Sequence, residues 1–69
     1  MGNICSVDLV ETIFGYAVVA DDGVKRWYVS AYYNGQYTWY SDKAWAKGFS
    51  LRSALMHYKR ICAQNHLAV

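Results

Sequence analysis

The chain has 69 residues, which is enough for one small domain and excludes a second independent core. Hydrophobic residues make up 55% and charged residues 17%, a composition that excludes intrinsic disorder. The net charge of +2 is too small for charge alone to indicate nucleic-acid binding. We therefore expect a single domain over residues 1–69, with residues 1–6 mobile, a sheet within 14–40 and a helix within 50–66.

The amino-terminal residues match a lipidation pattern. Residues 1–6 fit the N-myristoylation motif M-G-x-x-x-[ST], with Cys5 as a candidate second acylation site. Asp8 and Glu11 follow closely, and acidic side chains are repelled by an anionic leaflet, so we interpret the match as coincidence and leave lipidation of Gly2 or Cys5 open. No apolar run is long enough to span a bilayer and no secretion signal is present, so we expect a cytoplasmic protein.

Residues 7–13 are ambiguous between a short helical turn and a strand. Val7, Leu9, Val10 and Ile13 fit both patterns, because periodicity over so few residues does not decide between them. We favour a strand, with Gly15 as a β-bulge.

Two turn signals divide the next part of the chain into strands. Asp22-Gly23 predicts a hairpin between residues 14–20 and 24–33 that sets Val18 opposite Trp27. Asn34-Gly35 predicts a type I′ hairpin between residues 24–33 and 36–40. The second turn gives the opposed pairs Tyr33–Gln36, Tyr32–Tyr37, Ala31–Thr38, Ser30–Trp39 and Val29–Tyr40.

This register assigns each side chain to one of two faces, because successive strand residues point to opposite sides. The more apolar face is assigned to the core: Phe14, Tyr16, Val18, Ala20, Trp27, Val29, Ala31, Thr38 and Tyr40. The other face holds an aromatic patch with one cation: Arg26, Tyr28, Ser30, Tyr32, Tyr37 and Trp39.

After the sheet, capping residues predict a turn and then a helix. Asp42 is suited to cap a turn over residues 43–47, Ser50 is suited to cap the helix, and Phe49 is expected to pack on Ala54 as a hydrophobic staple. The apolar stripe of the helix is expected to be Leu51, Ala54, Leu55, Tyr58, Ile61, Cys62 and Asn65.

The expected fold class is α+β: a three-stranded antiparallel β-meander, or a four-stranded one if residues 7–13 join it, with one C-terminal α-helix packed on one face. His57 and His66 are expected on the outer side or at the frayed end of the helix, and no metal or cofactor motif is present, so we expect no enzyme activity. Cys62 is expected to be a buried apolar residue and Cys5 a free thiol, and a disulfide between them stays open.

The aromatic patch is the main functional expectation. Exposed apolar patches on small proteins usually mark interaction sites, and Tyr and Trp dominate binding hot spots. We expect Arg26, Tyr28, Tyr32, Tyr37 and Trp39 to bind a partner protein or a second copy in a homodimer. The alternative is a module for single-stranded nucleic acid that stacks bases on the same rings and holds phosphates with Lys25, Arg26, Lys43 and Lys47.

Residues 14–54 resemble a group of very small phage and prophage accessory proteins, on the following residues after the meander: Trp39, Asp42, Ala46, Phe49, Ser50 and Ala54. Some proteins of that class are anti-CRISPR or other anti-defence inhibitors. The resemblance implies a non-enzymatic inhibitor that occupies a host protein or protein complex in the host cytoplasm. The slightly basic charge departs from an acidic DNA mimic.

Overall fold

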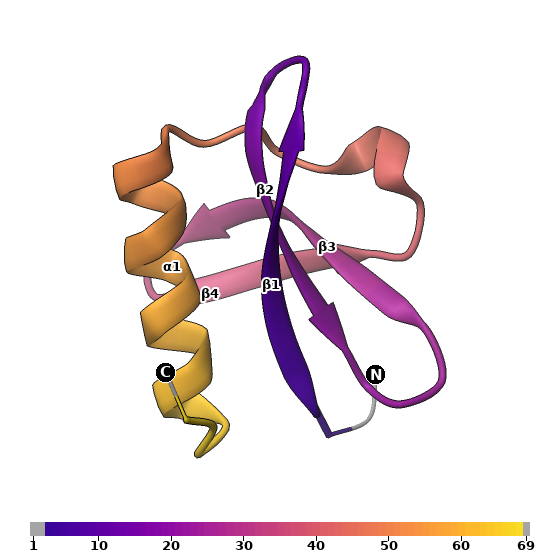
Figure 1. The fold of residues 1–69 in the computed structure, drawn as a ribbon, viewed down its shortest axis with the longest axis vertical. Coiled ribbons are helices and arrows are strands. Elements are labelled where there is room, and N and C mark those ends of the chain that lie inside the picture. Colours follow the sequence, from indigo (N-terminus) through magenta and orange to yellow (C-terminus); the bar gives the residue numbers. More distant parts are fainter. Residues whose placement is uncertain (1–2, 69) are drawn as a thin grey trace.

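A computed structural model describes residues 3–68. The strands are β1 (Ser6–Thr12), β2 (Gly15–Asp21), β3 (Arg26–Tyr33) and β4 (Gln36–Tyr40), followed by the 3₁₀ turn η1 (Lys43–Trp45) and helix α1 (Leu51–Gln64). The strands form one antiparallel sheet in the order β1-β2-β3-β4. The helix lies beside the β1–β2 hairpin, and β3 and β4 cross behind that hairpin in the view of Figure 1. The expected α+β class is confirmed, in its four-stranded form.

The β1–β2 hairpin confirms that residues 7–12 are a strand, and it contains no bulge at Gly15, so that expectation was wrong. Gly15 pairs directly with Thr12. Thr12 closes the turn, since its Oγ1 donates to the Gly15 carbonyl at 2.8 Å and accepts from the Phe14 amide at 3.1 Å. Glycine is required at position 15 because φ is +124° and a Cβ would lie 2.6 Å from the Phe49 carbonyl oxygen.

Two residues that precede β1 contact the rest of the fold. Ile4 packs against the core, and the amide of Cys5 donates to the Asp21 carbonyl at 2.7 Å. The expected mobility of residues 1–6 stays a prediction, and residues 1–2 lie outside the described residues.

The β2–β3 connection differs from the expected two-residue turn. Ala20, not Val18, is opposite Trp27, and the loop covers residues 22–25. The Asp22 side chain organises this loop: Oδ1 accepts from the amides of Val24 and Lys25, and Oδ2 accepts from Trp27 Nε1. The register is displaced by two residues, which leaves the side chains of β2 and of residues 26–29 on their expected faces.

The β3–β4 hairpin confirms the turn, with φ of +55° at Asn34 and +82° at Gly35, and its register holds back to the Ala31–Thr38 pair. Beyond that pair, Val29 rather than Ser30 lies opposite Trp39, because Ser30 is an extra residue at a β-bulge. The bulge accompanies a contact from another segment, since the Val29 carbonyl accepts from the Lys47 amide at 2.9 Å.

The segment between β4 and α1 crosses the start of β2. The Asp42 carboxylate caps η1 by accepting from the Ala44 amide, and Phe49 forms a bridge with Tyr16 through hydrogen bonds of 2.8 and 2.9 Å. Ser50 caps α1 as expected, with its Oγ accepting from the Ser53 amide at 3.2 Å. These caps fix where the helix begins and how it lies on the sheet.

The core lies between α1 and one face of the sheet. Its buried members are Val18, Val29, Phe49, Ala54 and Ile61. Residues 17–20 of β2 are all buried, so this central strand is shielded on both faces. Cys62 is also buried and Cys5 is a free, exposed thiol, as expected.

Candidate binding surface

The structure divides the expected aromatic patch between two faces. Tyr37 and Trp39 pack against the core, and the ring of Tyr32 contacts that of His57 on α1 at 4.7 Å between centroids. The expectation that these three rings face away from the helix was wrong, because the bulge at Ser30 reverses the parity of β4 and of the end of β3 relative to Val29. Only Arg26, which is exposed, and Tyr28, which is half-buried, lie on the face away from the helix.

The rings of Tyr32, Tyr37 and Phe49 surround a buried histidine, His57, and with Arg60 these residues form what we call the histidine cluster. His57 is 4% exposed, so its expected outer position on the helix was also wrong. Its Nδ1 lies 2.9 Å from the Tyr37 hydroxyl oxygen, and we assign the hydroxyl as the donor. Its ring contacts those of Tyr37 at 5.5 Å and Phe49 at 4.8 Å, and Arg60 lies over the Tyr32 ring and donates to its hydroxyl.

Burial sets the protonation of this histidine cluster. Desolvation lowers the pKa of His57 below its ordinary value of 6.5, and the positive charge of Arg60 acts in the same direction. Desolvation raises the pKa of Tyr37 above 10.0, and Arg60 opposes that change. Both groups are therefore neutral at pH 7, as a hydroxyl donor and an imidazole acceptor require. The cluster joins α1 to β3 and β4. The rings of Tyr32 and Tyr37 therefore serve to pack the helix on the sheet.

The outer face of α1 exposes Leu51 and Leu55, which were expected in the core, and also Met56. Leu51 is 47% exposed, Leu55 41% and Met56 48%, because the buried stripe of the helix is Ala54, His57, Ile61 and Cys62. The expected burial of Leu51 and Leu55 was wrong. That of Ala54, Ile61 and Cys62 is confirmed. The spacing of Ala54, His57 and Ile61 is also helical, so the sequence did contain a signal for the buried stripe. Leu51 and Leu55 were preferred for the core because they are more apolar than His57.

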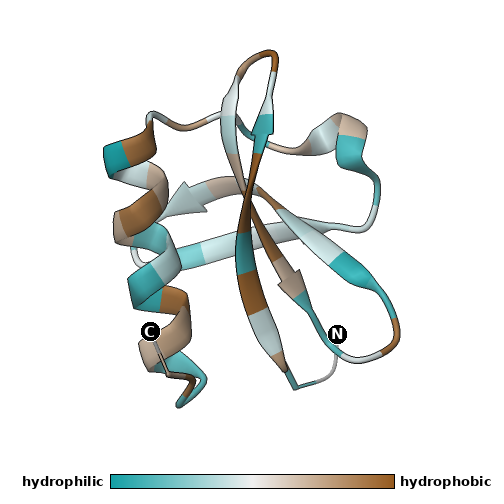
Figure 2. Ribbon diagram, in the orientation of Figure 1, coloured by the Kyte–Doolittle hydropathy of each residue, from teal (hydrophilic) through white to brown (hydrophobic). Residues whose placement is uncertain are grey.

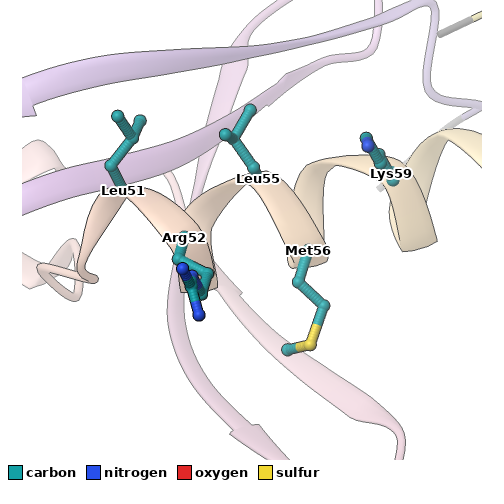
Figure 3. A pocket seen from close by; sticks show the side chains of 5 residues that line it. All are labelled: Leu51, Arg52, Leu55, Met56 and Lys59. Carbon is teal, nitrogen blue, oxygen red and sulfur yellow. The ribbon is translucent and has the colours of Figure 1, made fainter.

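These side chains line a shallow groove with a cationic border. The lining residues are Leu51, Arg52, Leu55, Met56 and Lys59. Leu51, Leu55 and Lys59 project in a row from one side of the helix, and Arg52 and Met56 project from the adjacent side (Figure 3). Because every lining residue comes from a single helix, the groove is a surface feature suited to a macromolecular partner, whereas small-molecule sites are concave and bury most of their ligand.

A second apolar surface lies at the tip of the β1–β2 hairpin. Ile13 and Phe14 form the turn and are largely exposed, and the tip is coloured as hydrophobic in Figure 2. Together with η1 the tip borders a second groove, lined by Glu11, Thr12, Ile13, Phe14, Lys43, Ala44 and Ala46. This lining carries charges of both signs and belongs to two separate segments.

Among residues 3–68, no group of three or more metal-ligating side chains comes together. In the same part of the chain, no helix has the length and apolarity needed to cross a membrane. Because it exposes three apolar side chains beside two cations, the outer face of α1, defined by its five lining residues, is the candidate binding surface.

Comparison with protein-family models, with curated proteins and with solved structures finds no match for this chain.

Proposed function

We propose that the chain is a small, non-enzymatic protein-binding module that acts by occupying a partner through the outer face of α1. The observation that carries the proposal is the group of neighbouring side chains Leu51, Leu55 and Met56, all more than 40% exposed on one helix. Contiguous exposed apolar side chains on a small protein are typical of interaction surfaces. This mode agrees with the phage-encoded inhibitors that the sequence resembles, which bind stoichiometrically to a host protein.

The helix offers these side chains in a fixed geometry. Ser50 caps its start, and its opposite stripe is anchored in the core through Ala54, His57 and Ile61. A pre-organised surface loses less conformational entropy on binding than a loop does. Met56 adds a flexible, polarisable side chain of the kind that adapts to irregular partner surfaces.

The nucleic-acid alternative loses the stacking platform it needs. Base stacking requires free ring faces, whereas Tyr32 and Tyr37 contact each other at 4.8 Å and both contact His57. We therefore expect no binding of a labelled single-stranded oligonucleotide. Binding that weakens steeply with salt would restore the alternative.

The test is the substitution Met56→Glu, compared with Val24→Glu. Both replace an exposed apolar side chain by the same carboxylate, and Val24 is 89% exposed in the β2–β3 loop, away from α1. Each tagged full-length variant is used to capture partners from host-cell lysate, with quantitative mass spectrometry. We expect a specific prey that Val24→Glu retains and Met56→Glu loses, and that forms a stoichiometric complex with the wild-type chain after purification.

Circular dichroism and thermal unfolding of each variant control for folding. A third variant, Phe14→Glu, tests the hairpin tip, where the side chain is also exposed. Loss of the prey with Phe14→Glu, together with retention in Met56→Glu, would assign binding to the tip and refute the proposed surface. An equal loss in all three variants would refute a localised apolar contact.

A further inference from the structure

We infer that the partner segment bound by the outer face of α1 is an acidic amphipathic helix. This inference rests on the proposed function and specifies the partner at the same surface. Leu51, Leu55 and Met56 supply the apolar side chains of the groove, Arg52 follows Leu51 in the first turn, and Lys59 lies at the C-terminal end (Figure 3). An apolar stripe bordered by Asp or Glu side chains would bury these apolar side chains and neutralise the two cations.

The two cations on this face, Arg52 and Lys59, form no stabilising charge pair within α1. α1 contains no acidic residue, so Arg52 and Lys59 have no carboxylate three or four residues away on their own helix. Arg52 lies in the first turn, where the helix dipole is positive and a cation is unfavourable. A negatively charged partner near Arg52 would interact favourably with both the side chain and the start of the helix.

Charge argues against a second copy of the chain as the occupant. If two α1 helices packed antiparallel about a centre between Leu55 and Met56, Arg52 of one copy would lie near Lys59 of the other. A parallel pair would set Arg52 beside Arg52. Like charges meet in both arrangements, and the helix carries no carboxylate to offset them.

The limited apolar area argues against a lipid surface. A helix that lies in a membrane interface uses a wide apolar face for insertion. The widest such face of α1 is already used against the sheet through Ala54, Ile61 and Cys62. Leu51, Leu55 and Met56 provide a narrow stripe, which fits side-by-side packing with one other helix.

The inference is tested with two synthetic peptides and the full-length chain. One peptide is an amphipathic helix with a leucine stripe flanked by glutamates, and the other has every glutamate replaced by lysine. Binding is measured by calorimetry and mapped by NMR on the ¹⁵N-labelled protein. We expect the glutamate peptide to bind and to shift resonances of α1, and the lysine peptide not to bind.

Charge reversal of the protein provides the specificity test. The double variant Arg52→Glu with Lys59→Glu is expected to weaken binding of the glutamate peptide by roughly tenfold or more and to gain binding of the lysine peptide. The matched control, Arg26→Glu with Lys43→Glu, makes the same change of charge at two exposed positions outside α1 and is expected to leave the affinity unchanged. If the reversal unfolds the chain, Arg52→Gln with Lys59→Gln replaces it, with a smaller expected weakening for the glutamate peptide and no gain of binding for the lysine peptide.

Several results would overturn the inference. They are equal binding of both peptides, an equal loss in the Arg26 and Lys43 control, binding to phosphatidylserine vesicles in place of the peptides, and a concentration-dependent dimer through α1. Failure of both peptides, with a prey that is still lost on Met56→Glu, would overturn the acidic-helix inference alone and leave the protein-binding proposal standing.

Discussion

Removing one hydroxyl from the histidine cluster tests whether His57 is held as a neutral acceptor in the core. Tyr37→Phe keeps the ring and its contacts with Tyr32 and Trp39 but leaves Nδ1 of the buried His57 without its donor at 2.9 Å. A buried acceptor without a partner costs about 1–3 kcal/mol. For a domain of this size, each kcal/mol lowers the melting temperature by roughly 4–8 °C. Tyr37→Phe should therefore lower the free energy of unfolding by about 1–3 kcal/mol at pH 7.5, as measured by urea unfolding followed by circular dichroism.

The same variant predicts a change in pH dependence. The unfolded chain protonates His57 near 6.5, whereas burial lowers the folded pKa, so below pH 6.5 the unfolded state binds more protons. The stability that this histidine contributes is complete above pH 6.5 and is lost as pH falls from there towards the lowered folded pKa. In Tyr37→Phe the neutral imidazole of His57 has lost its hydrogen-bond donor, so the pKa of His57 in the folded state rises. The variant therefore loses less stability than the wild type as the pH falls. The stability gap between the two proteins should therefore narrow in acid.

Tyr33→Phe is the matched control, because Tyr33 is 81% exposed beside the β3–β4 turn. Removing that hydroxyl should change the free energy of unfolding by no more than about 0.5 kcal/mol. Equal stability of the wild type and Tyr37→Phe at pH 7.5, or a gap that widens as pH falls, would refute the assignment of a neutral His57 that accepts from Tyr37.

Two further substitutions test the packing of the sheet. Trp39→Ala should lower the free energy of unfolding by up to about 3 kcal/mol, because the ring is half-buried against the core. A fully buried aromatic side chain would cost more. Unchanged urea unfolding would contradict the placement of this ring against the core. Gly48→Ala should lower the free energy of unfolding by at least ~1 kcal/mol and shift NMR resonances at the β1–β2 tip, because its Cβ would overlap the Phe14 carbonyl oxygen and the backbone must move. Native stability and an unchanged spectrum would show that no such close approach exists.

Several elements were predicted correctly because local chemistry decides them. Asn34-Gly35 gave the hairpin because both residues adopt positive φ, and Ser50 gave the helix start because its hydroxyl caps a backbone amide. The pattern of residues 7–13 left a helical turn and a strand open; the strand that we favoured is confirmed, and Val7 and Leu9 pack against the core. Each of these signals lies within a few residues of the feature it specifies.

The prediction of an exposed aromatic patch was wrong because the faces of β3 and β4 depend on a contact between residues that are distant in sequence. The β-bulge at Ser30 lies where the Val29 carbonyl accepts from the Lys47 amide, so its location involves a segment after the whole sheet. One extra residue in a strand reverses every side chain beyond it relative to the rest. No turn motif marks such a residue, and Ser30 is unremarkable in a strand. Tyr37 and Trp39 were therefore placed on the wrong face.

The exposure of the leucines follows from the same reversal. Once Tyr32, Tyr37 and Trp39 point towards the helix, the sheet already supplies bulky rings to that side of the core. A helix can approach such a surface only with small or shape-matched side chains, and α1 presents Ala54 and His57 there, with Ile61 further along. Rotation of the helix onto that stripe turns Leu51, Leu55 and Met56 outward. The bulge that removes the aromatic patch from the surface thus also accounts for the apolar groove on which the proposed function rests.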